Sequence, residues 1–302
     1  MLPRRRGGGF VPEKLSSFYS QTTQYIIMKN YITVAALLAA GTALSGAATG
    51  DLLWGLDFTS DSLTLTGEGT ASGSGTPNTT GGLFDTGSYS TGSDNSGKLT
   101  LNLGGDATSA LQEGYGAFTL SFHAKYEGGQ GDWPVLATFG VDGSYQYKLT
   151  YYANDKTLQL DKDGYPEMTG AGTNGKTFVG SGFTPSSNWA HYALVFGGEA
   201  GAKTISLYID GVKQGSTGTL ALTSTNAMTS FVLGGKINGN NASYLTLSDV
   251  AIYEGELDET QVAYLSDNKA PASFSAIPEP SAFGLLAGLG ALALVASRRR
   301  RK

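Results

Sequence analysis

The two histidines of the chain are the first candidates for acid–base chemistry, because imidazole exchanges protons near neutral pH. His191 lies inside an apolar run. A catalytic histidine needs a nucleophile and an orienting partner within hydrogen-bond reach, and the neighbouring sequence offers neither. We therefore predict a structural role for His191. His123 falls on the polar side of its segment, which predicts a surface or groove position rather than a ligand.

Aromatic side chains beside polar loop residues are a second kind of candidate, because flat rings can form platforms for a sugar. Trp133 lies in the loop 128–134, beside Asp132 and Gln130. Packing within the core or the loop is the alternative for this side chain. Trp189 is instead predicted to belong to the core. The aromatic candidates for ligand binding are Trp133, Tyr145, Tyr147 and Tyr165.

Acidic residues in turns are candidates for calcium, which prefers several oxygen ligands at flexible spacing. The candidates are Asp94, Asn95, Asp132 and Asp142. The string Asp161-Lys162-Asp163-Gly164 is only a fragment of an EF-hand loop, and the complete pattern is absent from the sequence. Solvated turn acids are the alternative. The prediction therefore requires no cofactor and keeps calcium as an optional ligand.

The composition restricts the class of protein that could carry these residues. The 302 residues include 44 glycines and no cysteine, and 15% are charged. This excludes disulfides, thiolate metal sites and cysteine nucleophiles, and it favours turns and strands over a charged helical protein. Ten of the 20 basic residues lie in the segments 1–50 and 281–302, whereas only one of the 25 acidic residues does, so residues 51–280 carry a net charge of −14. We therefore predict no nucleic-acid partner.

The N-terminal segment has the pattern of a secretory signal peptide. Met28, Lys29 and Asn30 precede an apolar run, residues 31–44, which is followed by small residues. The run is short for a membrane span. We predict that Met28 is the true start, with a transit segment or a long positive region as the alternative.

The C-terminal segment combines three elements in order. Pro278-Glu279-Pro280 precedes an apolar helix predicted over residues 282–296, and the cluster Arg298, Arg299, Arg300, Arg301 closes it. Fifteen residues cover about 22 Å, short of a ~30 Å hydrocarbon core, so the helix would span with help from flanking residues. The basic cluster would stay in the cytoplasm, which places the body outside that membrane.

The remaining body of about 230 residues shows alternating apolar and polar positions, separated by Gly, Asn and Asp. A hairpin is predicted across Asn154-Asp155, and another across Asp210-Gly211. The run from Trp189 to Phe196 is apolar on both faces and predicts a central strand, and Asp258 with Gln261 predicts a capped helix. Further predictions are a mobile loop over residues 67–82 and a turn at Asp161-Lys162-Asp163. The predicted strands are 118–126, 145–151, 157–160, 189–196, 205–209, 212–214, 231–233 and 245–253.

Two family resemblances follow from these strings. The tail resembles the PEP-CTERM sorting signal, which implies recognition by an exosortase-type membrane enzyme, cleavage near Pro278–Pro280, and export to the surface or matrix. An ordinary membrane anchor is the alternative. The body resembles LamG-type, concanavalin A-like domains, with His123 where the family often has Trp and Ser248 where it often has Asp. The blocks that carry this resemblance are 118–125, 188–196, 205–212 and 247–261.

The resemblance implies an all-β fold, a two-sheet antiparallel jelly-roll sandwich, joined to an N-terminal signal helix and a C-terminal transmembrane helix. The predicted parts are the extension and signal peptide 1–48, the sandwich 49–268, the linker 269–277 and the sorting signal 278–302. Glucanase relatives carry paired acids as E-x-D-x-x-E on one strand. The nearest string here runs from Glu256 through Asp258 to Gln261, lacks the third acid and matches the capped helix.

We therefore predict an exported, membrane-anchored or cell-surface protein that is not an enzyme and has no catalytic residues. Its predicted role is recognition or adhesion through an exopolysaccharide or surface glycan. One alternative is a divergent glycoside hydrolase of the same fold. The other is a structural surface protein without a small ligand.

Overall fold

The chain divides into two compact units, residues 1–47 and 48–302. The computed structural model describes only residues of the second unit: 50–60, 63, 65–67, 69–93, 97–103, 117–141, 145–163, 168–169, 176–198, 203–220, 230–237 and 241–274. The predicted signal helix, the C-terminal helix 282–296 and the sorting residues Pro278–Arg301 lie outside these residues.

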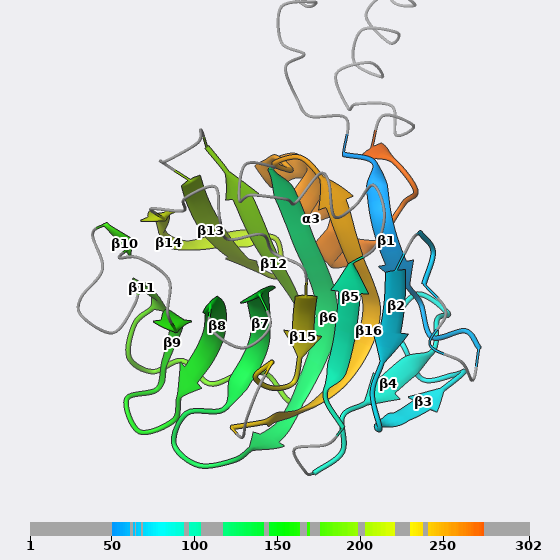
Figure 1. Ribbon diagram of the computed structural model, residues 1–302, viewed down its shortest axis with the longest axis horizontal. Coiled ribbons are helices and arrows are strands. Elements are labelled where there is room, and N and C mark those ends of the chain that lie inside the picture. The colour runs from blue at the N-terminus through cyan, green and yellow to red at the C-terminus, as the bar shows by residue number, and fades with distance from the viewer. Residues whose placement is uncertain are drawn as a thin grey trace, which may run out of the picture. The chain divides into compact units, whose positions relative to one another are not determined.

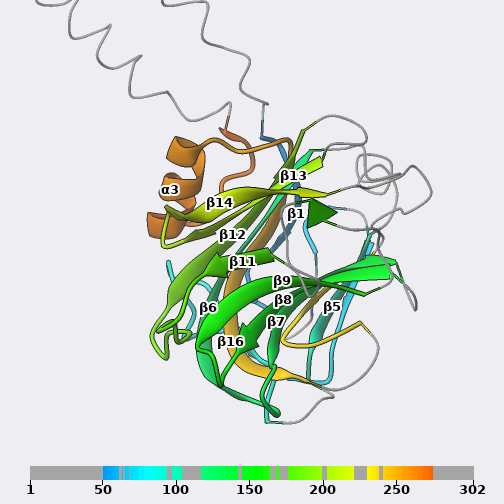
Figure 2. The same cartoon turned by 90° about the vertical axis from the view of Figure 1, so that its left-hand side faces the viewer.

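Two antiparallel sheets form the body, which confirms the predicted sandwich (Figures 1 and 2). The nine-stranded sheet has the order β10 (Met168–Thr169), β14 (Val212–Leu220), β13 (Lys203–Ile209), β12 (Ala190–Gly197), β6 (Phe118–Gly129), β16 (Ser243–Glu254), β4 (Ser88–Ser90), β3 (Thr76–Asn78), with β1 (Leu52–Leu56) also on β16. The seven-stranded sheet has the order β11 (Lys176–Val179), β9 (Thr157–Asp163), β8 (Tyr145–Tyr152), β7 (Val135–Val141), β15 (Ser230–Leu233), β5 (Leu99–Leu103), β2 (Gly69–Ser72).

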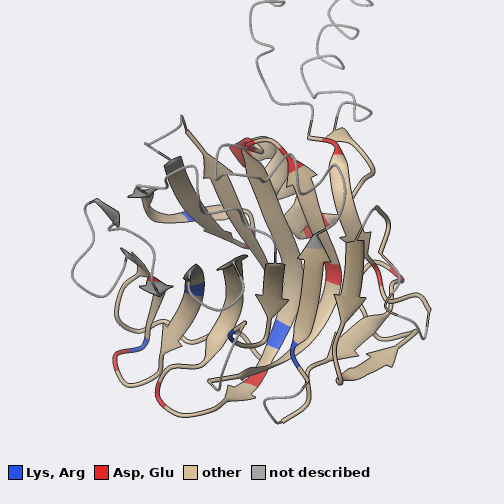
Figure 3. Cartoon of the chain, viewed as in Figure 1, with Lys and Arg blue, Asp and Glu red and all other residues tan. Residues whose placement is uncertain are grey.

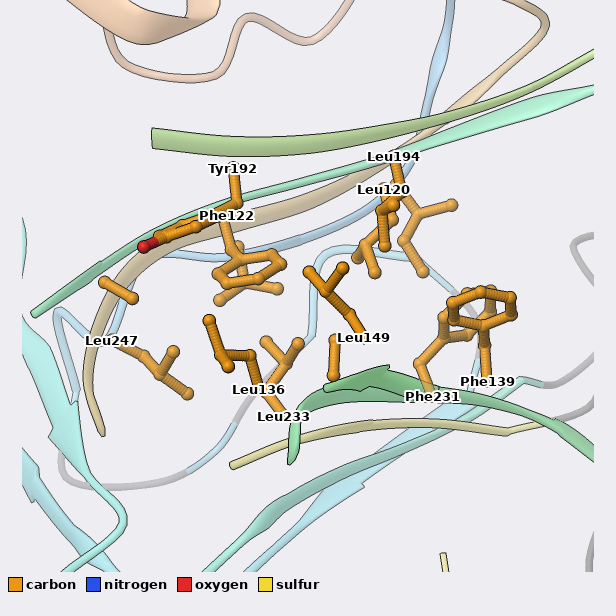
Figure 4. Close-up of a cluster of buried hydrophobic side chains, with 14 of the residues drawn as sticks. Leu120, Phe122, Leu136, Phe139, Leu149, Tyr192, Leu194, Phe231, Leu233 and Leu247 are labelled. Carbon is orange, nitrogen blue, oxygen red and sulfur yellow. The ribbon is translucent and has the colours of Figure 1, made fainter. Parts of the chain in front are cut away.

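Alternating side chains turn one face of each sheet toward the other, and these faces form the core. Phe118, Leu120 and Phe122 of β6 are buried there with Phe139 of β7 and Leu149 of β8. Figure 4 shows Leu120, Phe122, Phe139 and Leu149 between the sheets. Strand β12 lies between β13 and β6 and is buried over its whole length, which confirms its predicted central position.

One helix, α3 (Glu259–Asp267), covers the face of the nine-stranded sheet that points away from the core (Figure 2). Val262 and Leu265 pack in a second apolar cluster with Val195 and Tyr253. The predicted capping box is present, because Asp258 Oδ1 accepts from the Gln261 amide at 2.8 Å and Gln261 Oε1 accepts from the Asp258 amide at 2.9 Å.

The glycine-rich residues 67–82, predicted as a mobile loop, contain the strands β2 and β3. The glycines serve the close packing of Tyr89, whose ring is fully buried. The Gly75 amide donates to the Tyr89 hydroxyl at 2.7 Å, and a Cβ at Gly73 would collide with that hydroxyl. The prediction was wrong because the missing periodicity reflects glycine packed against an aromatic ring rather than freedom of the chain.

Residues 269–274, predicted as part of a linker, are docked on the body, and we call them the strap. The Leu52 amide donates to the Ala272 carbonyl at 3.0 Å, and Ser273 forms an antiparallel bridge with Asp51. Phe274 is 7% exposed. The described body therefore begins and ends at the same edge of the nine-stranded sheet (Figure 1).

Candidate functional site

The outer face of the seven-stranded sheet carries a row of polar side chains. Alternate residues of β8 and β9 enter the core, so the residues between them lie on the opposite face. In this register Lys148 is paired with Asp161, and Thr150 with Gln159. We call this row the β8–β9 face; it comprises Lys148, Thr150, Tyr152, Gln159 and Asp161.

These polar groups are well shielded although they lie outside the core. Lys148 is 8% exposed, Asp161 7% and Thr150 2%. Among the described residues, no group forms a hydrogen bond with Thr150 Oγ1. Burying a hydroxyl without a partner is unfavourable, and Thr150 Oγ1 is too well buried for a surface ligand to reach it. The half-buried members of the β8–β9 face are Tyr152 and Gln159.

An aromatic pair lies at one end of the β8–β9 face. The Trp133 side chain is 54% exposed, and its ring centroid lies 6.3 Å from that of Tyr152 at an interplanar angle of 52°. The Tyr152 hydroxyl donates to Asp161 Oδ1 at 2.9 Å. Burial and then the charge of Asp161 raise the pKa of Tyr152, so the phenol keeps its proton at neutral pH.

Backbone hydrogen bonds hold the β6–β7 turn that presents Trp133. The Tyr151 amide donates to the Pro134 carbonyl and the Ala153 amide to the Asp132 carbonyl, both at 2.9 Å. The Asn241 side-chain amide also donates to the Trp133 carbonyl at 3.3 Å. Because these hydrogen bonds fix the turn, the exposed indole can bind a flat ligand with little loss of conformational entropy.

The predicted aromatic candidates differ in their exposure to solvent. Trp133 is at the surface, whereas Tyr147 is fully buried between the sheets, so it cannot contact a surface ligand. Tyr145 begins β8, with a side chain outside the described set, and Tyr165 is outside the described residues altogether. Sequence reasoning missed Tyr152 as a site residue, although the alternation of β8 placed its neighbours Lys148 and Thr150 on the polar face.

The calcium candidates do not form a site within the described part of the chain. Asp132 is an exposed turn residue, and Asp94, Asn95 and Asp142 fall outside the described residues. Within those residues, no group of three or more His, Asp or Glu side chains could hold a metal ion. The calcium prediction therefore remains a prediction.

The two histidines form a buried cross-strand pair under α3. His191 is 1% exposed, with Nε2 at 2.9 Å from Ser121 Oγ. His123 is 2% exposed, and its ring centroid lies 4.8 Å from that of His191. The predicted surface position of His123 was wrong, because α3 covers the polar side of β6 and the Ser266 carbonyl lies 3.3 Å from His123 Nε2.

The buried histidines are suited to structure rather than to catalysis. Burial, followed by the nearby charge of His123, lowers the pKa of His191 well below its ordinary value. Burial also lowers the pKa of His123. Both rings are therefore neutral at neutral pH, and neither is open to a substrate.

The carboxylate strings also have structural explanations. Asp258 caps α3, so it does not belong to a catalytic strand. The segment Asp161-Lys162-Asp163 was predicted as a turn, but β9 continues through Asp163. On the β8–β9 face, Asp161 is the one carboxylate among the described side chains, whereas a retaining glycosidase needs two that are ~5–5.5 Å apart.

This sandwich of two antiparallel sheets has the architecture of a concanavalin A-like domain. The family model described as the concanavalin A-like lectin/glucanases superfamily matches residues 104–263, and the chain belongs to this superfamily. A second model, the PEP-CTERM protein-sorting motif, matches residues 276–301. The chain is therefore a concanavalin A-like protein with a sorting signal for export to the cell surface.

Solved structures share the fold at low sequence identity. A sialidase from Trypanosoma rangeli, in complex with 2,3-difluorosialic acid, has 14% identity and a TM-score of 0.52, covering 73% of this chain and 33% of the sialidase. The binding domain of botulinum neurotoxin DC, in complex with rat synaptotagmin II, has 14% identity and a TM-score of 0.50, covering 72% of this chain and 51% of that one.

Domain 4 of AbnA, an extracellular arabinanase from Geobacillus stearothermophilus in complex with arabinotriose, has 18% identity and a TM-score of 0.46, covering 73% of this chain and all of that domain. The chain thus spans about a third of the sialidase and half of the neurotoxin domain. None of the curated proteins compared with the chain matches it in sequence.

The described residues contain no helix that is long and apolar enough to cross a membrane.

Proposed function

We propose that the body is a non-catalytic glycan-binding module, displayed outside the cell and bound to an exopolysaccharide or another surface glycan. One observation carries the proposal: an exposed indole, Trp133, stands beside Tyr152 at the end of a shielded polar face. A sugar ring would stack on the indole, while its hydroxyls exchange hydrogen bonds with Tyr152 and Gln159, the half-buried members of the β8–β9 face.

The charge of the body favours a neutral or weakly charged glycan. Residues 51–280 carry a net charge of −14, which repels a polyanionic chain at long range. Tyr152 and Gln159, the half-buried members of the β8–β9 face, can each donate and accept hydrogen bonds. Sugar hydroxyls can do both, so they match such a face without carrying a charge.

The test is binding of the body, residues 49–277, to a glycan array with and without calcium. We expect Trp133→Ala to weaken binding to the selected glycan by about tenfold or more, equivalent to at least ~1.4 kcal/mol. The matched control is Val212→Ala, because Val212 is an exposed apolar residue (63%) on the other sheet. Unchanged binding by Trp133→Ala would place the site elsewhere.

The same assay separates the alternatives. A structural surface protein would bind no glycan on the array. A divergent hydrolase would release reducing sugar from the glycan that it binds.

A further inference from the structure

The strap is held on the body by a few specific contacts. The Tyr253 hydroxyl donates to the Pro271 carbonyl at 3.0 Å, and the Ala270 amide donates to Asp249 Oδ2 at 2.8 Å. Ser273 Oγ donates to Asp51 Oδ1 at 2.6 Å. The Phe274 ring packs against Tyr253, with ring centroids 5.2 Å apart. The last described residue of the chain is thus anchored to the folded body.

This anchor sets an upper limit on the distance to the sorting motif. The motif model begins at residue 276, and Pro278 lies only four residues after Phe274. Four residues span at most ~14 Å when fully extended. With the strap docked, Pro278 therefore stays within that distance of the body surface.

The short reach conflicts with processing at a membrane. An enzyme that acts near Pro278–Pro280 must take up chain on both sides of the bond, while the apolar segment 282–296 is directed toward the bilayer. A folded sandwich within ~14 Å would compete for the same space. Three exposed acids, Asp51, Glu254 and Asp267, lie near the strap against one exposed lysine, Lys269, which is paired with Asp57. Figure 3 shows acidic segments on α3 and at the start of β1. This excess of negative charge does not favour close contact with anionic headgroups.

Undocking of the strap would remove this conflict. Residues 269–274 add six residues to the reach, so the distance from the body to Pro278 could rise to ~35 Å. Only Phe274 in the strap is buried, and the other five residues are exposed or half-buried. Segments with few buried contacts open locally at a small fraction of the global unfolding free energy.

We propose that the strap leaves β1 during processing and that the membrane enzyme takes up residues 269–277 as an extended peptide. Pairing with β1 and pairing with the enzyme are then mutually exclusive, and docking restrains removal of the tail. In the processing step one peptide bond near Pro278–Pro280 breaks. Its carbonyl carbon passes to a nucleophile, water in the simplest case, and the tail leaves with a new amino terminus.

An engineered disulfide can lock the strap, because the chain has no cysteine of its own. Asp51 and Ser273 are antiparallel partners, and such pairs have the Cα separation that a disulfide accepts. The full-length Asp51→Cys/Ser273→Cys chain is incubated with membranes that contain the processing enzyme. We expect at least tenfold slower loss of the tail, by mass spectrometry, when the disulfide is formed, with recovery after reduction.

Three controls make the result specific. Each single cysteine variant should be processed equally with and without reductant. Insertion of ten Gly/Ser residues after Ser275 should restore processing of the locked chain, because the added reach replaces undocking. Phe274→Ala, which removes the anchor, should speed tail removal in the chain without cysteines.

The proposal is overturned if the locked chain loses its tail at the wild-type rate, if the insertion fails to rescue it, or if the wild-type tail is never removed. Binding of the locked chain to the glycan array should equal that of the wild type. A failure of glycan binding would leave the processing result unaffected, so the two proposals can fail independently.

Discussion

At the scale of single residues, a β-bulge in β16 turns the neighbouring side chains of Ser248 and Asp249 toward different parts of the chain. The register of β16 against β6 shifts between Ser248 and Ala251, and Asp249 adopts a positive φ of 49°. Ser248 Oγ accepts from the Leu83 amide at 3.0 Å and so holds the loop before β4. Asp249 turns toward the strap and is 4% exposed.

Asp249 should reduce stability at neutral pH. Burial raises its pKa to about 6, against an ordinary value of 3.8, so the folded state binds the proton more tightly than the unfolded state. Stability therefore falls as pH rises from about 4 to 6, and the loss is complete at pH 7. Asp249→Asn should raise the free energy of unfolding at pH 7 by about 1–3 kcal/mol, measured by urea denaturation. A midpoint at or below that of the wild type would contradict this.

The histidine pair should have the opposite pH dependence. Both rings are neutral in the fold and become charged on unfolding below pH ~6.5, so stability is lost as pH falls below that value. The charged groups near His123 are Asp210 and Asp267. In an Asp249→Asn background, His191→Gln should lose less unfolding free energy between pH 7.5 and 5 than its parent. Equal losses would show that the pair does not carry the effect.

At the scale of elements, α3 depends on its cap. Asp258→Ala removes one partner of the capping box and should lower the unfolding free energy by about 1 kcal/mol, measured as a lower melting temperature. Glu259→Gln is the matched control, since it removes an exposed acid from the same turn without touching the cap. Equal melting temperatures for the two variants would show that the cap does not stabilise the helix.

The sequence predicted those elements whose local pattern agrees with their packing. The alternation in β6 and β8, the Asp210-Gly211 turn and the Asp258 cap all follow from neighbouring residues. The strap and strand β2 could not be predicted this way, because their partners, at the start of β1 and in β5, lie far away in the sequence. Strand β3 pairs with the nearby β4, but its short Gly-flanked sequence has no alternating pattern. Trp189, predicted as core, is only half-buried, with Lys125 Nζ 4.6 Å above its ring.

The candidate site was only partly predictable for the same reason. Trp133 stands out as an indole in a polar loop, and its exposure agrees with that interpretation. The contribution of Tyr152 and Asp161 could not be predicted without the register of β8 against β9. This pairing brings the Tyr152 hydroxyl to Asp161. Tyr147 and Tyr152 lie an odd number of residues apart in β8, so their side chains point to opposite faces of the sheet. The sequence alone did not show which of these faces is buried.

At the scale of the whole molecule, the pair Trp133 and Tyr152 lies at one end of the body and the strap lies at the other. The described chain begins and ends at one end, near Gly50 and Phe274, whereas the β6–β7 turn lies at the other (Figures 1 and 2). A chain held at its C-terminus would therefore present the turn with Trp133 away from the membrane. Recognition of an external glycan needs this orientation.

This orientation predicts a difference in labelling on intact cells that still carry the tail. Lys156→Cys lies in the β8–β9 turn, and Ala272→Cys lies in the strap; both positions are exposed in the body. Residue 272 is six residues from Pro278, so it stays within ~21 Å of the sorting motif. A 5-kDa polyethylene glycol maleimide should therefore label Lys156→Cys at least several-fold faster, whereas detergent should equalise the two rates. Equal rates on intact cells would mean that the strap end does not face the membrane, and no labelling of either variant would mean that the body is not outside.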